Sequence, residues 1–264
     1  MPQVRLRPGL LRPLQDYPCP MSTRRLARKM LITIAAALLL TACGRGGEAT
    51  ATAVAATPTP INPQAALERT GDVMQGVSSF RFRLYHDNGS LELMPNFFVD
   101  TAQGDVVNPD KLSVSFEGKY GTGFAIRSNV ITIGDSTYMT NPINGSWERS
   151  DTLVSPLGFF KPTEGISAMT RQVKDATLLA DRTGQDGTFV LSGNLPAEAL
   201  APLLGQTAAS ATVRAELTVR AATGHLERAK ISGAVTPSDK PDVVRTIVLS
   251  GFNESIPISA PTSS

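Results

Sequence analysis

The chain has 264 residues, of which 41% are apolar and 18% are charged, and its 25 basic and 23 acidic side chains leave a net charge of +2. A balance so near zero argues against a broad basic face for nucleic acid, and two cysteines are too few for a disulfide-dense scaffold. These totals include an N-terminal segment with the features of a targeting signal, so the segments are taken separately.

Residues 1–42 are expected to form a signal-peptide region. Four basic residues between 24 and 29 precede a run of mostly apolar residues at 31–40, and small residues then lead to Cys43. This is the order of a secretory signal peptide, and the apolar run is too short for a membrane-spanning helix of about 20 residues. Residues 1–20 have no counterpart in such a signal, which favours Met21 as the translation start.

The sequence Leu40-Thr41-Ala42-Cys43 resembles the bacterial lipobox. The resemblance implies that Cys43 receives a diacylglyceryl group and becomes the acylated N-terminus of the mature protein. The expected location is the cell membrane, with the protein lipid-anchored on the extracytoplasmic face. The alternative is a chance cysteine that follows a simple secretion signal.

Residues 43–62 are small, polar and interrupted by proline, which predicts a flexible linker between the anchor and a domain at 63–264. Removing residues 1–42 takes away seven basic residues and one acidic residue, which leaves 18 against 22, or a net charge of −4. A mildly acidic domain gains no general attraction to anionic lipids. Membrane residence is therefore expected to depend on the acyl chains at Cys43.

The domain is predicted to open with a helix over residues 63–76, because Asn62 can cap it and Pro63 suits its first position. Further helices are predicted at 164–174 and 196–204. A period of two predicts strands around residues 79–85, 98–106, 112–117, 124–127, 131–133, 137–140, 177–181, 188–192, 213–220, 226–235 and 243–252. Turn sequences such as Asn88-Gly89 separate them, so the strands are expected to run antiparallel. The fold class is α+β, with one strongly curved antiparallel sheet and a few helices on one face.

A search for chemistry finds no catalytic constellation. There are two histidines, His86 and His225, and no cysteine remains for a thiol nucleophile once Cys43 is acylated. Zinc ligands, a G-x-S-x-G elbow and phosphate-binding glycine loops are also missing. Acids such as Glu148 and Asp151 are read as surface residues. The protein is expected to be no enzyme and to need no cofactor, and a lipid hydrolase would lack an identifiable nucleophile and base.

Five segments carry a resemblance to a known family, namely residues 102–109, 130–147, 187–195, 215–228 and 248–252. In this order and spacing the chain resembles the lipoproteins LppX, LprA, LprF and LprG, which share the half-barrel of the LolA and LolB carriers. One departure is the strand near Thr218 and Arg220, where relatives often have an aromatic residue and an acid.

The resemblance implies a half-barrel with helices packed on its concave face, and a carrier that holds acyl chains between them. At about 0.8 kcal/mol per buried methylene, exposing a sixteen-carbon chain to water costs roughly 12 kcal/mol, so a lipid that crosses water needs an apolar cavity. The expected partners are an acyl lipid or glycolipid, the membrane through lipidated Cys43, and a membrane lipid transporter, with no nucleic acid. The protein is expected to be a monomer.

The candidate lipid-binding residues are apolar side chains of the predicted strands together with those of the segment near residue 160, which is expected to guard the mouth. They are Phe82, Val114, Phe116, Phe124, Ile126, Ile133, Tyr138, Phe159, Phe160, Ile166 and Met169. The alternative for each is ordinary core packing. The alternative for the whole protein is an envelope lipoprotein that senses lipid or binds a protein partner without transport.

Overall fold

The structure is a computed structural model that describes residues 60–262 with the exception of 151–154 and 156. The described residues fall within one compact unit. The predicted signal region 1–42, the acylation site Cys43 and all but the end of the predicted linker 43–62 lie outside the described residues. No helix in the described part of the chain is long and apolar enough to cross a membrane.

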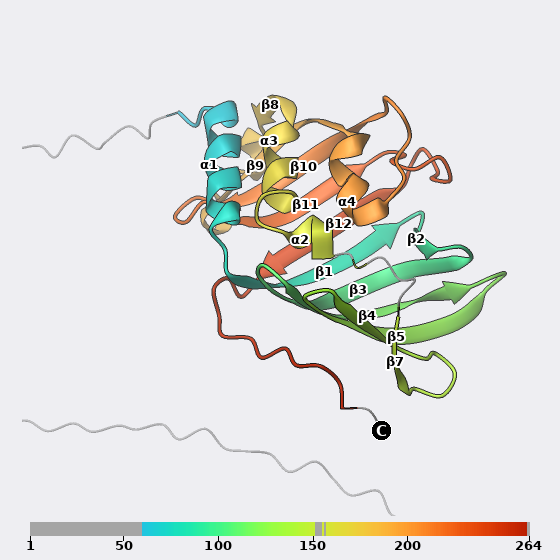
Figure 1. Cartoon of the computed structure of the whole chain (residues 1–264). Coiled ribbons are helices and arrows are strands. Elements are labelled where there is room, and N and C mark those ends of the chain that lie inside the picture. The colour runs from blue at the N-terminus through green and yellow to red at the C-terminus, as the bar shows by residue number, and fades with distance from the viewer. Residues whose placement is uncertain (1–59, 151–154, 156, 263–264) are drawn as a thin grey trace, which may run out of the picture. The chain divides into compact units, whose positions relative to one another are not determined.

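The fold is built on one antiparallel sheet of 12 strands (Figure 1). In chain order these are β1 (Ser79–Asp87), β2 (Leu91–Met94), β3 (Phe97–Val107), β4 (Lys111–Tyr120), β5 (Phe124–Ile133), β6 (Ser136–Thr140), β7 (Trp147–Arg149), β8 (Lys174–Leu178), β9 (Thr188–Pro196), β10 (Thr212–Arg220), β11 (Leu226–Ser232) and β12 (Val244–Ser250). Their spatial order is β7-β6-β5-β4-β3-β1-β12-β11-β10-β9-β8, and β2 pairs only with β3. The first and last strands of this order do not pair, so the sheet stays open.

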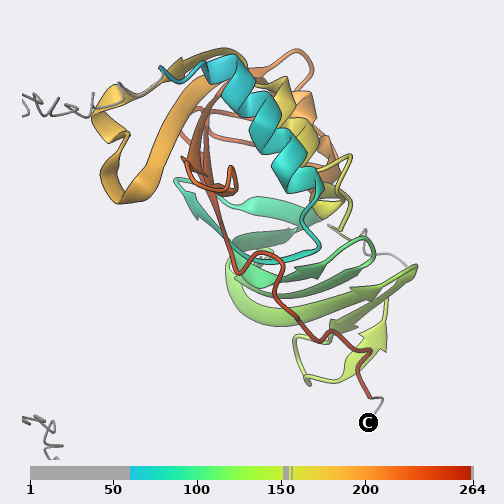
Figure 2. The ribbon, with the colours of Figure 1, turned by 90° about the vertical axis from the view of Figure 1, so that its left-hand side faces the viewer.

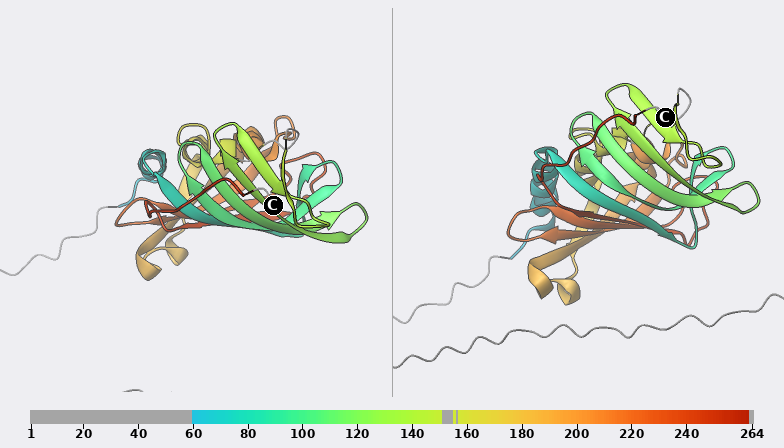
Figure 3. Two further views of the ribbon diagram at one scale, coloured as in Figure 1. Left: turned by 60° about the horizontal axis from the view of Figure 1, so that its bottom comes forward. Right: turned by 90° about the horizontal axis from the view of Figure 1, so that it is seen from below.

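The helices lie together on one side of this sheet (Figures 1 and 2). They are α1 (Pro63–Gln75), α2 (Leu157–Phe160), α3 (Ile166–Gln172) and α4 (Ala201–Leu204), and the 3-10 turn η3 (Ala197–Leu200) leads into α4. The 3-10 turns η1 (Ala180–Arg182) and η2 (Gln185–Gly187) lie between β8 and β9, on the opposite side of the sheet (Figure 3). The Asn62 side chain caps α1 by accepting a hydrogen bond from the Ala65 N–H at 3.1 Å. Arg171 of α3 donates to Asp72 and Gln75 of α1, which holds these two helices together.

The pairing register separates an inner from an outer face of the sheet. Phe82 of β1 lies opposite Gly104 of β3, which lies opposite Val114 of β4. Directly paired residues share one face, so these residues face the helices, whereas Arg83 on the same strand faces outward. Figure 3 shows the strong bend of the sheet, whose hollow side carries the helices. The expected fold class, an α+β half-barrel with helices on the concave face, is confirmed.

The core fills the space between the inner face and the helices. It is one continuous cluster of buried apolar side chains, including Leu67 and Met74 of α1, Phe80 of β1, Leu217 of β10 and Leu249 of β12. The helix α1 therefore docks by its apolar side, as its periodicity predicts.

Four elements differ from the sequence prediction. The short strands β2 and β7 were not predicted, and residues 196–204 form the 3-10 turn η3 followed by one turn of α-helix, α4. The segment near Phe159 and Phe160 was expected to be an exposed loop that guards the mouth, but it forms α2 with both side chains buried. Burial of two adjacent aromatic rings in a neighbouring core is favourable, because it removes their apolar surface from water.

Candidate functional site

The concave face holds a first apolar crevice of about 40 Å³. Every side chain around it is apolar, and they come from β1 to β5, β12, α2 and α4. The lining residues are Phe82, Leu84, Leu91, Val99, Ala102, Val114, Phe116, Val130, Phe160, Leu203 and Ile247. Such a surface can take up a hydrocarbon chain and offers nothing to a polar ligand.

A second crevice of about 20 Å³ continues beneath the helices. It is lined by Leu84, Phe159, Met169, Leu200, Leu203, Leu204, Ala229, Ile231, Arg245 and Ile247. The two crevices share Leu84, Leu203 and Ile247, so they form one seam between the sheet and α4. Ligand sites usually measure about 300–1,000 Å³, so the seam is closed in this structure and has to open for a lipid.

Aromatic contacts fix α2 over the seam. The Phe160 ring lies 4.5 Å from the Phe82 ring and 5.8 Å from the Phe80 ring, measured between centroids, and Phe159 packs edge-on against Phe160 at 5.4 Å. Ring pairs at these separations add attraction beyond the area that they bury. The α2 helix is thus a wall of the crevice and not a flap at its mouth.

The structure brings together six of the eleven candidate residues. Phe82, Val114, Phe116 and Phe160 line the first crevice, and Phe159 and Met169 line the second. Ile126 and Ile166 are buried in the same core but line neither crevice.

The expected inward position of three other candidates is wrong. Ile133 lies opposite Lys111, and Tyr138 lies opposite Ile131, so both occupy the outer face of the sheet. Strands β5 and β6 put their even-numbered and odd-numbered residues, respectively, toward the helices, a relation that only the register decides. Phe124 has inner-face parity but stands at the first position of β5, beyond the helices, and is 68% exposed.

Sequence reasoning missed the residues that join the two crevices. Leu84 continues the alternation of Phe80 and Phe82 and could have been found from it. Leu203 and Ile247 belong to segments whose apolar periodicity was recognised. Their contact with the candidate lipid-binding residues depends on how segments far apart in sequence pack together. A further missed feature is a set of inward hydroxyl groups on β5 and β6, where Ser128 donates to the Thr140 carbonyl at 2.7 Å.

A buried ion pair lies at the second crevice. Arg245 on β12 is only 4% exposed and donates from Nη2 to an oxygen of Asp239. The other Asp239 oxygen accepts from the N–H groups of Val235 and Thr236, each at 2.8 Å. Burial alone would raise the pKa of Asp239, but these hydrogen bonds hold that pKa below its ordinary value.

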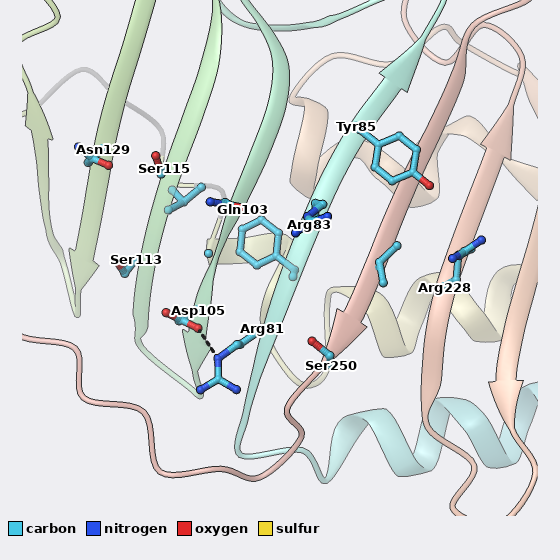
Figure 4. Close-up of a pocket in the computed structure, with 14 residues that line it drawn as sticks. Arg81, Arg83, Tyr85, Gln103, Asp105, Ser113, Ser115, Asn129, Arg228 and Ser250 are labelled. Atoms are coloured by element: carbon cyan, nitrogen blue, oxygen red, sulfur yellow. Dashed lines mark ion pairs between the residues drawn. The ribbon is translucent and has the colours of Figure 1, made fainter. Parts of the chain in front are cut away.

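The outer face is hollowed as well, but its chemistry is polar (Figure 4). A depression of about 730 Å³ runs over β5, β4, β3, β1, β12 and β11, and its labelled side chains are hydroxyl, amide, carboxylate and guanidinium groups. Arg81 pairs there with Asp105 at 3.4 Å. Phe82, Val114 and Val248 also line this depression, but charged and polar side chains stand among them. The concave seam, whose first crevice is wholly apolar, is therefore the candidate lipid site. Among the described residues, no group of three or more His, Cys, Asp or Glu could hold a metal ion.

Fold and site together define a class of protein: an open half-barrel that encloses an apolar seam between one bent sheet and a few helices. The chain belongs to the LppX_LprAFG lipoprotein family, whose model matches residues 62–258. No protein with a curated description matches the chain.

A solved structure supports the fold, and two further matches are weaker. The crystal structure of LprF from Mycobacterium bovis matches with a TM-score of 0.60 at 18% identity, over 76% of this chain and 97% of that chain. Lipoprotein LppX from Mycobacterium tuberculosis matches with a TM-score of 0.48 at 17% identity, over 74% and 97%. A LolA superfamily protein from Nitrosomonas europaea gives 0.26 at 14% identity, over 75% and 96%. At such low identities the likeness to LprF is one of fold.

Proposed function

We propose that this protein binds an acyl lipid or lipoglycan in the concave seam and carries it through the cell envelope. The observation that carries the proposal is the wholly apolar lining of the first crevice, to which both the sheet and the helices contribute. A closed apolar seam between a rigid sheet and short helices can open without breaking the strand pairing. The lipoprotein family to which the chain belongs supports the same function.

The membrane attachment in this proposal rests on the sequence of the N-terminal segment. Acylation of Cys43 would hold the domain on the extracytoplasmic face, and a linker up to residue 62 would let it approach or leave the bilayer. A carrier that picks up lipid from a membrane also needs a donor, which we propose to be a membrane lipid transporter. The protein is proposed to act as a monomer.

The test is native mass spectrometry of the full-length protein after exposure to lipid, with the bound lipid extracted and identified. We expect an exchangeable acyl lipid on the wild type and much less on Leu203→Trp, because the larger side chain fills the point where the two crevices meet. Leu203 is only half-buried, so this variant is expected to fold.

Ser115→Trp is the matched control, since Ser115 follows Val114 on β4 but faces the outer depression. It adds the same indole to the opposite face of the same sheet. The absence of any exchangeable acyl lipid on the wild type would refute the proposal. Equal lipid occupancy in Leu203→Trp and the wild type would remove the seam as the site.

A further inference from the structure

Arg245 occupies an inward position that the strand pattern reserves for apolar residues. On β12 the residues that face the helices are Arg245, Ile247 and Leu249. A guanidinium group stays charged at any pH a protein experiences, so it is costly to bury unless each of its donors finds an acceptor. The residue therefore calls for a full account of its hydrogen bonds.

Two of the three donor nitrogens of Arg245 find no acceptor among the described residues. Nη2 of Arg245 is taken by Asp239, but Nε and Nη1 are buried and have no acceptor among the described residues. The remaining oxygen of Asp239 is occupied by two backbone N–H groups, so Asp239 does not serve the spare donors. Buried groups of this kind are rare in proteins and point to a partner that is not part of the chain.

The surroundings restrict what that partner can be. Arg245 lines the second crevice, where it is the one polar side chain among the described lining residues. Leu84, Phe159 and Met169 stand around the same space and offer no acceptor. An acceptor oxygen that reaches Arg245 therefore has to arrive on a molecule that is otherwise apolar.

His86, the neighbour of Arg245 on β1, also has a buried polar atom without a partner among the described residues. It lies directly opposite Arg245 in the β1–β12 ladder, and its Nδ1 contacts the Asp100 carbonyl at 3.0 Å. A carbonyl only accepts, so Nδ1 carries the hydrogen, and Nε2, which is also buried, has no partner among the described residues. Unpartnered polar atoms of Arg245 and His86 thus lie on directly paired residues of β12 and β1.

We propose that Arg245 belongs to the lipid site and binds the carboxyl or ester carbonyl oxygen of an acyl chain held in the seam. The ligand class is then an acyl compound whose oxygen-bearing end is buried at Arg245, with its hydrocarbon chain along Leu203 toward the first crevice. This inference rests on the proposed function, and it adds the chemistry of the buried oxygen-bearing end.

The experiment compares two ligands of equal chain length, dodecanoate and dodecylammonium, by displacement of a fluorescent acyl probe. The full-length protein is held in a fluorinated surfactant to limit competition for hydrocarbon. Dodecanoate offers acceptors to Arg245, whereas dodecylammonium offers only donors and a positive charge. We expect dodecanoate to bind about tenfold more tightly or better.

The double variant Arg245→Met with Asp239→Asn removes the buried charges together, and the new amide can still accept from the backbone of Val235 and Thr236. In it the preference for dodecanoate should fall to about onefold. The control is Arg182→Met with Glu216→Gln, which removes an ion pair of 3.0 Å between η1 and β10 and should keep the full preference.

Each outcome decides a separate statement. Equal affinity of the wild type for the two ligands overturns the binding of an acyl oxygen by Arg245 and leaves lipid binding in the seam intact. Failure of the wild type to bind either ligand overturns the proposed function along with it. Should the double variant not fold, the wild-type comparison decides alone.

Discussion

At the scale of single residues, the two histidines are the groups whose protonation matters near neutral pH. Burial lowers the pKa of His86 below its ordinary value of 6.5, and the charge of Arg245 lowers it further, against the opposing effects of Asp100 and Asp239. Burial also lowers the pKa of His225, which stacks on Phe252 with ring centroids 4.3 Å apart. Both imidazoles are therefore held neutral by the fold.

The lowered pKa values of the histidines predict that the folded protein loses stability as the pH falls. A depressed folded pKa contributes stability that is complete above the unfolded value of 6.5 and is lost as the pH falls toward the folded pKa. The free energy of unfolding from urea titrations should fall between pH 7.5 and pH 5, and His86→Gln should flatten that fall. Asp239 does not contribute in this window, because its pKa lies below the ordinary 3.8. An unchanged slope in His86→Gln would show that other groups set it.

The unusual position of Arg245 could have been recognised from the sequence. A charge at an inward position of an otherwise alternating apolar strand is a signal visible in the sequence. It breaks the pattern of Val243, Ile247 and Leu249, all of which are buried. The sequence could not show which acceptors Arg245 meets. Asp239 lies in the preceding loop, and the donors of Arg245 without an acceptor are recognised only in three dimensions.

At the scale of elements, strands β3 and β4 approach each other closely at Gly104. A side-chain carbon at Gly104 of β3 would overlap the carbonyl oxygen of Ser113 and would lie 2.9 Å from the Cα of Val114 and 3.1 Å from the Phe82 ring. Backbone atoms cannot move aside as a flexible side chain can. The inner face thus has a site where any larger residue would push β3 away from β4.

Gly104→Ala is accordingly expected to destabilise the protein by about 1–3 kcal/mol, the usual cost of overpacking. The control is Gly158→Ala on α2, where the added carbon meets only the Pro202 oxygen at 3.9 Å and alanine favours the helix. Urea midpoints compare the two variants. Equal midpoints would mean that β3 and β4 can separate without cost.

Elements also show the limits of pattern reading. The alternation on β1 and β4 predicted the inner faces correctly, because long strands leave no doubt about which set of residues is apolar. On β5 and β6, residues of both faces are apolar, as Val130 and Ile131 illustrate, so the pattern cannot choose between them. The pairing of β5 with β4 makes the choice, and it places Ile133 and Tyr138 outside.

At the scale of the whole molecule, the small volume of the seam implies a conformational step before lipid enters. Crevices of about 40 and 20 Å³ hold no acyl chain, while the sheet is tied by pairing along nearly its full width. The short helix α4 is held less firmly than the sheet, because it has only one turn and its residues are half-buried or exposed. Opening is therefore expected to move α4 away from β1 and β12.

The uptake rate of a fluorescent fatty acid, measured by stopped flow, should consequently level off as the lipid concentration rises, at a ceiling set by opening. Leu203→Ala truncates the α4 side chain that both crevices share and should raise this ceiling. Pro202→Ala, at an exposed position of the same turn, should not. A rate that grows in proportion to lipid at all concentrations would contradict a closed resting state.

The sequence by itself determined the class of this domain, because strand alternation and helix periodicity are local properties that burial on one face imposes. It yielded the inner faces of β1 and β4, the docking face of α1 and an open antiparallel sheet. Only the tertiary structure decided the burial of Phe159 and Phe160, the exposure of Phe124 and the meeting of Leu203 with Arg245. The reason is physical: each of these depends on which distant segment arrives opposite a residue, and contacts across the whole fold settle that.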